Sequence, residues 1–264
     1  MARFPSIFIS HGAPNLALHN SEARDFLAGY GRTLGKPKAI LVCSAHFETA
    51  APMLTADAQP ETIYDFGGFE PELYKMTYKA PGSPELAVRA AAMLGAAGIK
   101  AQTVTGRGFD HGTWVPMKLM YQDADVPVVQ ISIQPQAGAA HHAALGAALA
   151  PLREEGILLA GSGLATHNLG AFFRAGKRPR MDDAVPEWVA SFNNWLHDKV
   201  EAGALDDVAH YRARAPNARE NHPSEDHFLP LPFAMAAAGP GAKGERLHSS
   251  HQYGVFMMDF YAFA

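Results

Sequence analysis

The stretch Ile157-Leu158-Leu159-Ala160-Gly161-Ser162-Gly163-Leu164-Ala165-Thr166-His167-Asn168-Leu169 carries the pattern that decides the fold. It begins as an apolar run, continues through small residues and ends close to a histidine. Because the run is short and is followed by Gly-Ser-Gly, it predicts a buried strand rather than a helix. The glycines let the backbone bend and pack where a side chain would clash. We therefore expect His167 just past the strand, at the carboxyl edge where open α/β sheets bind ligands.

The same pattern occurs twice more in the first part of the chain. The apolar run 4–10 leads into His11-Gly12, and the apolar run 39–45 leads into His46. A single histidine after a strand most often only hydrogen-bonds a loop. Three strands that each deliver a histidine at the same end favour a shared site instead.

Length and composition are those of a globular protein. The chain has 264 residues, of which 48% are hydrophobic and 18% charged, so we expect a single catalytic domain over residues 1–264. The net charge is −4, and the brief basic run 177–180 is typical of a solvated loop, so no nucleic-acid partner is expected.

The lack of a recognisable targeting signal and the low cysteine content predict a cytoplasmic protein. No apolar run approaches the length of a membrane span, and no signal peptide precedes the first expected strand. Cys43 is the only cysteine, whereas there are 13 histidines. Any metal site must therefore be built from nitrogen and oxygen ligands.

Strands and helices alternate over the first two thirds of the chain. This order predicts an α/β fold with a mixed, mostly parallel central sheet and helices on both faces. The helices expected from apolar periodicity and capping residues are 21–34, 84–98, 115–121, 139–155, 185–202, 206–213 and 225–238. The remaining strands are expected at 99–105, 126–133 and 252–260.

Two further segments carry expectations of their own. The long irregular stretch 48–84 suits a lid or pocket wall, with a surface-packed loop containing short strands as the alternative. A glycine-rich segment brings Asp110 and His111 to a turn. His141 and His142, in the first turn of the helix expected at 139–155, are expected to be exposed.

The histidines after the first two strands predict a metal site. Histidine is the commonest metal ligand near neutral pH, and His11 and His46 at neighbouring strand ends can converge on one ion. The candidates for a third ligand are His111, His167, His222, His227 and the carboxylates beside them. His227 is favoured because the helix expected at 225–238 turns apolar directly after it and must pack on the core. Two or three protein ligands with open positions indicate a catalytic metal.

Seven motifs, in this order, resemble the class III extradiol ring-cleaving dioxygenases, most closely the DOPA 4,5-dioxygenase-like branch. The similarity covers nearly the whole chain. The motifs are Ser10-His11-Gly12-Ala13-Pro14, Ser44-Ala45-His46-Phe47, Tyr64-Asp65-Phe66-Gly67-Gly68-Phe69, Ala80-Pro81-Gly82-Ser83-Pro84, Phe109-Asp110-His111-Gly112-Thr113-Trp114, Gly161-Ser162-Gly163-Leu164-Ala165-Thr166-His167-Asn168-Leu169 and Glu225-Asp226-His227-Phe228-Leu229-Pro230-Leu231.

The resemblance implies an oxidoreductase that opens a catechol ring with O2 at one non-haem divalent metal, Fe(II) or Zn(II). It implies His11, His46 and His227 as the metal ligands, with a histidine where better-known class III enzymes have a glutamate. His167 is the implied general base and acid. His111 is the implied second pocket histidine, which hydrogen-bonds a catechol oxygen or the bound oxygen.

For a flat ring substrate, the aromatic loop from Tyr64 to Tyr74 is expected to cover the pocket, with Phe66 and Phe69 as substrate-binding residues. A zinc-dependent hydrolase on the same histidines and a non-catalytic adaptor protein of the same fold are the alternatives. The sequence leaves open which catechol is cleaved, whether iron or zinc is the physiological metal, whether His167 also ligates it, and which oligomer forms.

Overall fold

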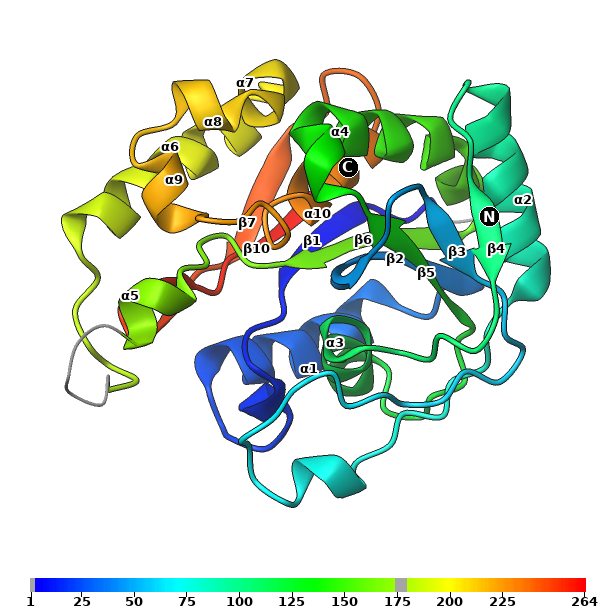
Figure 1. Cartoon of the computed structure of the whole chain (residues 1–264), viewed down its shortest axis with the longest axis horizontal. Coiled ribbons are helices and arrows are strands. Elements are labelled where there is room, and N and C mark those ends of the chain that lie inside the picture. The colour runs from blue at the N-terminus through cyan, green and yellow to red at the C-terminus, as the bar shows by residue number, and fades with distance from the viewer. Residues whose placement is uncertain (1–2, 174–179) are drawn as a thin grey trace.

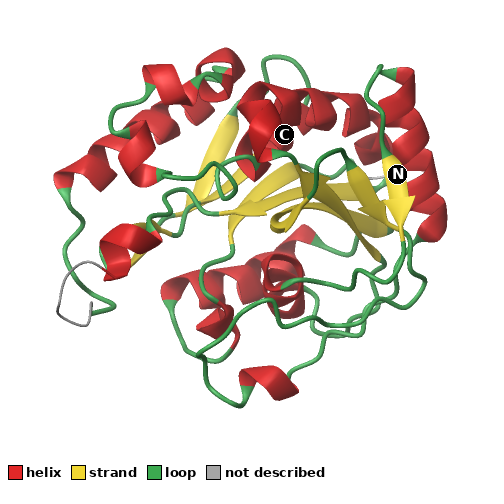
Figure 2. Ribbon diagram, in the orientation of Figure 1, coloured by secondary structure: helices red, strands yellow, loops and turns green. Residues whose placement is uncertain are grey.

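A central sheet with helices on both faces organises the computed structural model, which describes residues 3–173 and 180–264 (Figures 1 and 2). Lys177, Arg178 and Pro179 of the short basic run lie outside the described residues. Among the described residues, the sheet has eight strands in the order β4-β3-β5-β2-β6-β1-β10-β7. They are β1 (Ser6–Ser10), β2 (Ala39–Glu48), β3 (Met53–Thr55), β4 (Gln102–Val104), β5 (Val128–Ile133), β6 (Ile157–Gly163), β7 (Gly244–His248) and β10 (Phe260–Phe263).

The centre of the sheet is parallel and its margins are mixed. β6 lies between β1 and β2 and pairs with both in parallel, and β5 continues the parallel set beside β2. β10 and β7 add an antiparallel edge, and β3 runs antiparallel to β5 and parallel to β4. The predicted α/β class with a mixed, mostly parallel sheet is thereby confirmed.

Helices cover the sheet on both sides. Figure 1 shows α1 and α3 below the sheet, α4 above it and α2 at its right-hand end. α2, α4 and α10 pack on the same apolar core, on the face opposite to α1 and α3. The helices are α1 (Glu22–Leu34), α2 (Pro84–Ala96), α3 (His111–Met120), α4 (Gly138–Leu149), α5 (Leu169–Phe173), α6 (Glu187–Glu201), α7 (Leu205–Ala209), α8 (Tyr211–Arg214), α9 (Ala218–Asn221) and α10 (Pro230–Ala237). None of the helices in the described part of the chain is both long and apolar enough to cross a bilayer.

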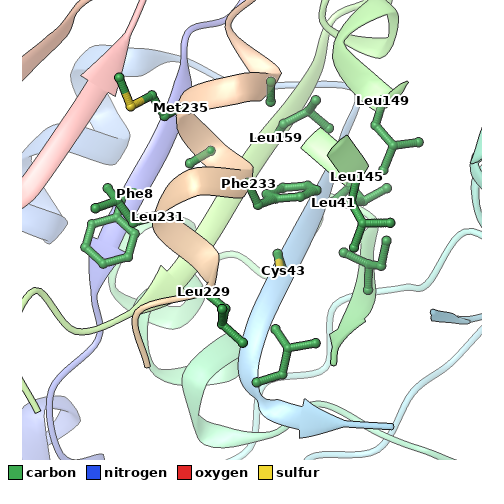
Figure 3. Packing of buried hydrophobic residues seen from close by; sticks show 14 of the residues in the cluster. Phe8, Leu41, Cys43, Leu145, Leu149, Leu159, Leu229, Leu231, Phe233 and Met235 are labelled. Carbon is green, nitrogen blue, oxygen red and sulfur yellow. The ribbon is translucent and has the colours of Figure 1, made fainter. Parts of the chain in front are cut away.

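The side chains of the buried strands alternate between two apolar cores, as the two-residue period of a strand requires. In β2, Leu41 and Cys43 face the core between the sheet and α2, α4 and α10. Ile40 and Val42 face the core between the sheet and α1 and α3. Figure 3 shows the first of these cores, with Leu41 and Cys43 near Phe233 of α10. Both faces being covered explains why these strands read as continuous apolar runs.

Two glycines of β6 let another segment lie directly on the strand. A Cβ atom on Gly161 would come 2.0 Å from the carbonyl oxygen of Pro230, and one on Gly163 would come 2.1 Å from that of His227. The amide of Leu164 in turn donates to the His227 carbonyl at 3.0 Å. The Gly-Ser-Gly segment therefore sets how close His227 comes to the sheet edge.

Two expectations near the site were wrong. His111 does not lie in a turn but begins α3, because the side chain of Asp110 caps the helix by accepting a hydrogen bond from the Thr113 amide at 3.0 Å. The helix expected at 225–238 begins only at Pro230, so His227 lies in the turn before α10. That turn leaves the His227 carbonyl free to pair with the loop after β6.

Away from the site, His142 is buried and not exposed, because its ring bridges α4 and the end of β5. Its Nδ1 bonds the Gly138 carbonyl at 2.8 Å, and its Nε2 accepts from the Gln134 amide at 3.0 Å.

The C-terminal strand expected at 252–260 is also broken into separate pieces. β8 (His251–Gln252) and β9 (Phe256–Met257) form a small hairpin, and β10 starts at Phe260. The chain reverses between β8 and β9, where Tyr253 and Gly254 adopt positive φ angles. A continuous extended strand cannot include such a reversal.

Candidate metal centre

His11 and His46 meet at the carboxyl edge of the sheet, on either side of β6. His11 follows β1, and His46 lies in the last part of β2, beyond the point where its pairing with β5 shifts register. Their Nε2 atoms are 3.0 Å apart. The sequence suggested that β1 and β2 are neighbours. This was wrong, because β6 lies between them.

A serine of β6 determines which nitrogen of His11 carries the proton. The Ser162 hydroxyl donates to the Gly112 carbonyl, and its oxygen lies 3.0 Å from Nδ1 of His11. Since the hydroxyl hydrogen is already used, Ser162 accepts the Nδ1–H of His11. Nε2 of His11 therefore presents a lone pair towards His46.

His227 brings a third imidazole to the same point. One ligand nitrogen each from His11, His46 and His227 lies within 4.8 Å of the others. Nδ1 of His227 donates to Oδ2 of Asp226 at 2.6 Å, so its Nε2 is the nitrogen with the lone pair. Burial raises the pKa of Asp226, but the hydrogen bond from His227 outweighs this effect, and the net shift of the pKa is downward.

The protonation of this cluster suits a cation. Burial, and then the neighbouring histidines, hold the pKa values of His11 and His46 well below 6.5. Both rings are therefore uncharged at neutral pH and offer lone pairs. Converging imidazoles, two of them oriented by a second hydrogen bond to Ser162 or Asp226, are the donor set that binds divalent transition metals. The residues fit a single non-haem metal ion.

His111 lies beside this cluster and is held by a carboxylate. Its ring centroid is 3.9 Å from that of His46 and 5.4 Å from that of His11. Asp65 accepts from the His111 backbone amide and lies against Nδ1 of its ring, both at 2.9 Å. Burial raises the pKa of Asp65, but the hydrogen bonds from His111 lower it by more. The net shift of the pKa is downward, so the carboxyl group is ionised at neutral pH.

His167 lies on the opposite side of the cluster, stacked on His227. The two ring centroids are 3.6 Å apart and the ring planes differ by 17°. The backbone amide of His167 donates to the Asn221 carbonyl at 3.0 Å, which holds the loop after β6 in place. Burial, and then His227, lower the pKa of His167, so its ring is uncharged and can accept a proton.

The aromatic loop lies on the His111 side of the site. The Phe66 ring packs edge-on to His111, with 5.6 Å between centroids, and Phe69 packs against Phe66 at 5.5 Å. Tyr74 also contacts Phe66 at 5.3 Å. Phe66 therefore borders the histidine cluster, while Phe69 supports it from behind.

All five histidines singled out as site residues come together, but the earlier candidate His222 does not join them. It is fully buried, and its Nε2 bonds the Ala165 carbonyl at 2.9 Å. Sequence reasoning missed Ser162, Asp65 and Asp226, which orient three of the histidines. Each of the three lies within a motif already noted, and the pairing of each with a histidine becomes visible only in the fold.

Comparison with known proteins agrees with this site. Residues 7–263 match the family described as the catalytic LigB subunit of aromatic ring-opening dioxygenase. The chain is 44% identical over 262 residues to a protein of Beta vulgaris named 4,5-DOPA dioxygenase extradiol, covering 98% of this chain and 96% of that one. A protein of Escherichia coli strain K12 with the same name is 37% identical over 238 residues, 89% of this chain and 85% of that one.

A solved structure has the same fold. The crystal structure of an uncharacterized protein from Escherichia coli K12 superimposes with a TM-score of 0.79 at 31% identity, covering 99% of this chain and 100% of that one. Fold and site thus define an aromatic ring-opening dioxygenase with a non-haem metal. The chain belongs to the LigB family. Its predicted activity, extradiol opening of a catechol-type ring with O2, is confirmed at the level of the reaction class.

Proposed function

We propose that this enzyme opens the ring of DOPA or a closely related 3,4-dihydroxyphenyl compound at an Fe(II) ion held by His11, His46 and His227. The single observation that carries the site is the convergence of one nitrogen from each of these residues within 4.8 Å. Relatives named 4,5-DOPA dioxygenase extradiol, at up to 44% identity over nearly the full chain, support the substrate class.

Iron is the metal we favour over zinc. Bound Fe(II) would supply a Lewis acid for the two diol oxygens and an electron path between the ring and O2, whereas zinc has no redox chemistry. The protein side of the site suits this task, because Ser162 and Asp226 orient two of the three imidazoles and leave their Nε2 lone pairs free.

His167 is the group we assign to proton transfer. A catechol must lose protons when its oxygens bind a cation, and the opened product must regain one. His167 is uncharged and is stacked on His227, so it lies at the edge of the cluster. We propose that it takes a proton from a substrate hydroxyl and returns it to the product, the usual work of a positioned acid–base group.

Phe66 is the side chain we assign to the substrate ring. It lies edge-on to His111 and is only partly buried, so it offers apolar surface beside the histidines. Phe69 and Tyr74 hold it in position from behind. A cytoplasmic location and a single catalytic domain over residues 1–264 stay predictions.

The test is anaerobic loading with Fe(II), followed by addition of catechols that differ in their side chain. O2 uptake together with a yellow ring-opened product, fastest with DOPA, is the expected result. Protein loaded with Zn(II) is the control and should consume no O2. Iron-loaded protein that binds one iron per chain, yet consumes no O2 with any catechol, would show the proposal to be wrong.

A further inference from the structure

Asp65 lies against two histidines of the site with a single carboxylate. Its Oδ1 accepts the backbone N–H of His111 at 2.9 Å, and its Oδ2 lies 2.9 Å from Nδ1 of the same residue. The same Oδ2 is 3.6 Å from Nδ1 of His46. One carboxylate thus holds a pocket histidine by two hydrogen bonds and lies beside a proposed metal ligand.

These contacts determine the tautomer of His111. An ionised carboxylate only accepts hydrogen bonds, so Nδ1 of His111 must carry the hydrogen. In the neutral ring, the other nitrogen, Nε2, then carries a lone pair and accepts. The histidine is consequently prepared to receive a hydrogen bond from a hydroxyl group rather than to give one.

The loop that carries Asp65 is anchored to the same helix as His111. The indole N–H of Trp114 in α3 donates to the Ile63 carbonyl at 3.2 Å, and the Tyr64 hydroxyl donates to the Met76 carbonyl at 2.8 Å. Phe66 packs on the His111 ring itself. Contacts of the residues before and after Asp65 therefore hold its carboxylate at the start of α3. The Asp65 side chain is 20% exposed.

Capping of α3 does not explain the ring contact. Asp110 already caps this helix by accepting from the Thr113 amide. The His111 amide is one of the first-turn N–H groups that have no partner within the helix. Asp65 satisfies that amide with one oxygen. A residue needed only for capping would leave the second oxygen to solvent, whereas here it faces the imidazole.

We propose that Asp65 is a positioning residue, which fixes the Nδ1–H tautomer and the ring orientation of His111 so that its Nε2 accepts a hydrogen bond from a hydroxyl of the aromatic diol. This role rests on the proposed function, because it presupposes a diol bound at the histidine cluster. It also gives the loop from Tyr64 to Tyr74 a second task besides covering the pocket.

The test is Asp65→Asn, which keeps the shape and exchanges one acceptor for a donor. The amide oxygen can still accept the His111 backbone N–H, so its NH2 group faces Nδ1 and favours the Nε2–H tautomer. In zinc-loaded protein, which is diamagnetic, 15N chemical shifts of the His111 ring should show the change of tautomer. Affinity for the probe 4-nitrocatechol and kcat/KM of the iron-loaded enzyme should each fall roughly 10- to 100-fold, with bound metal near the wild-type value.

Asp226→Asn is the matched control on the other side of the site. Asp226 bonds His227 at 2.6 Å, so this variant should lower metal affinity roughly 10- to 100-fold while the His111 tautomer stays as in the wild type. Asp65→Glu, which keeps the carboxylate, should restore the Nδ1–H tautomer and part of the 4-nitrocatechol affinity. Thermal unfolding of all three variants checks that they fold.

Two results would overturn the proposal. One is an unchanged His111 tautomer in Asp65→Asn. The other is loss of metal in Asp65→Asn as large as in Asp226→Asn, which would make Asp65 a support for His46 instead. Neither readout needs turnover, so a failure of ring opening in the wild type would count against the proposed function and leave the role of Asp65 to be judged separately.

Discussion

Single histidines at this site differ in what their second nitrogen contacts, and this difference separates their roles. Ser162 holds His11 at Nδ1, and Asp226 holds His227 at Nδ1. The Nε2 atom of each ring therefore points away from the residue that holds it. His167 instead stacks on His227 through its ring face. A ring held at Nδ1 presents its Nε2 lone pair in one fixed direction, to the metal position from His11 and His227 and to the substrate side from His111. A ring held by stacking, such as His167, keeps its nitrogens available for proton exchange.

Replacing His167 separates proton transfer from metal binding. His167→Phe keeps the ring that stacks on His227 and removes the proton acceptor. We expect near-normal iron content and retained catechol binding, with turnover reduced by roughly two to four orders of magnitude. Metal analysis and steady-state O2 uptake measure the two effects. A variant that loses its iron completely would identify His167 as a ligand instead.

The second prediction concerns the proposed ligands. His11→Ala and His46→Ala should each abolish stoichiometric metal binding, because two remaining imidazoles hold a divalent ion weakly. His222→Gln is a useful comparison, since the His222 ring is buried but bonds the Ala165 carbonyl through Nε2 instead of joining the cluster. Its metal content should match the wild type even where its thermal stability falls. Wild-type iron content in His11→Ala would remove that residue from the site.

At the scale of the element, β6 controls how close the turn containing His227 comes to the sheet. Gly163→Ala would place a Cβ atom 2.1 Å from the His227 carbonyl oxygen, so the turn must shift. We expect destabilisation of about 1–3 kcal/mol, as for overpacking in other cores, and lower metal affinity. Denaturant unfolding and metal titration measure these changes.

Gly29→Ala in α1 is the matched control, because no atom beyond the neighbouring backbone of its own helix lies within 4 Å of the added Cβ. It should leave metal affinity unchanged and increase stability by up to about 1 kcal/mol through helix propensity. Equal metal affinity in Gly163→Ala and Gly29→Ala would show that β6 does not position His227.

The aromatic loop supplies the other prediction at this scale. Phe66→Ala should raise KM for the catechol with little change in metal content, because Phe66 packs against His111. Phe69→Ala should have the same direction of effect but a smaller size, because Phe69 contacts Phe66 rather than the histidines. Steady-state kinetics with metal analysis separate the two. A fall in metal content at unchanged KM would contradict a role in substrate binding.

At the scale of the whole molecule, buried uncharged histidines make stability depend on pH. Burial lowers the pKa of His142 to about 4, below its ordinary value of 6.5. The unfolded chain therefore binds a proton that the folded chain excludes, and stability falls as pH drops from about 6.5 towards 4. From this shift we expect about 2 kcal/mol less stability at pH 5 than at pH 7.5 from His142 alone.

His142→Gln tests this expectation. The variant should be less stable at pH 7.5, since the hydrogen bonds from Gln134 and to Gly138 are altered, but should lose less stability on acidification. Urea unfolding at the two pH values measures both quantities. An identical pH dependence in wild type and variant would show that His142 does not contribute.

Much of the fold and most of the site could be predicted from local patterns. The apolar runs that end before His11, His46 and His167 identified three parallel strands, and helix caps such as Ser21 and Ser83 were recognisable from their neighbours in the chain. These features depend on residues a few positions apart. The same patterns could not reveal that β6 lies between β1 and β2, because strand order depends on packing between distant segments.

By itself, the sequence determined the α/β class, the family and the set of five histidines, since each follows from motifs that are continuous in the chain. Only the tertiary structure decided which atoms meet. It placed His227 in a turn on the glycines of β6, and it joined His111 to Asp65 across 46 positions. It also buried His142. The position of this residue in the first turn of an alanine-rich helix had predicted an exposed side chain. The physical reason is that hydrogen-bond partners, burial and tautomers are set by the neighbours that folding brings into contact.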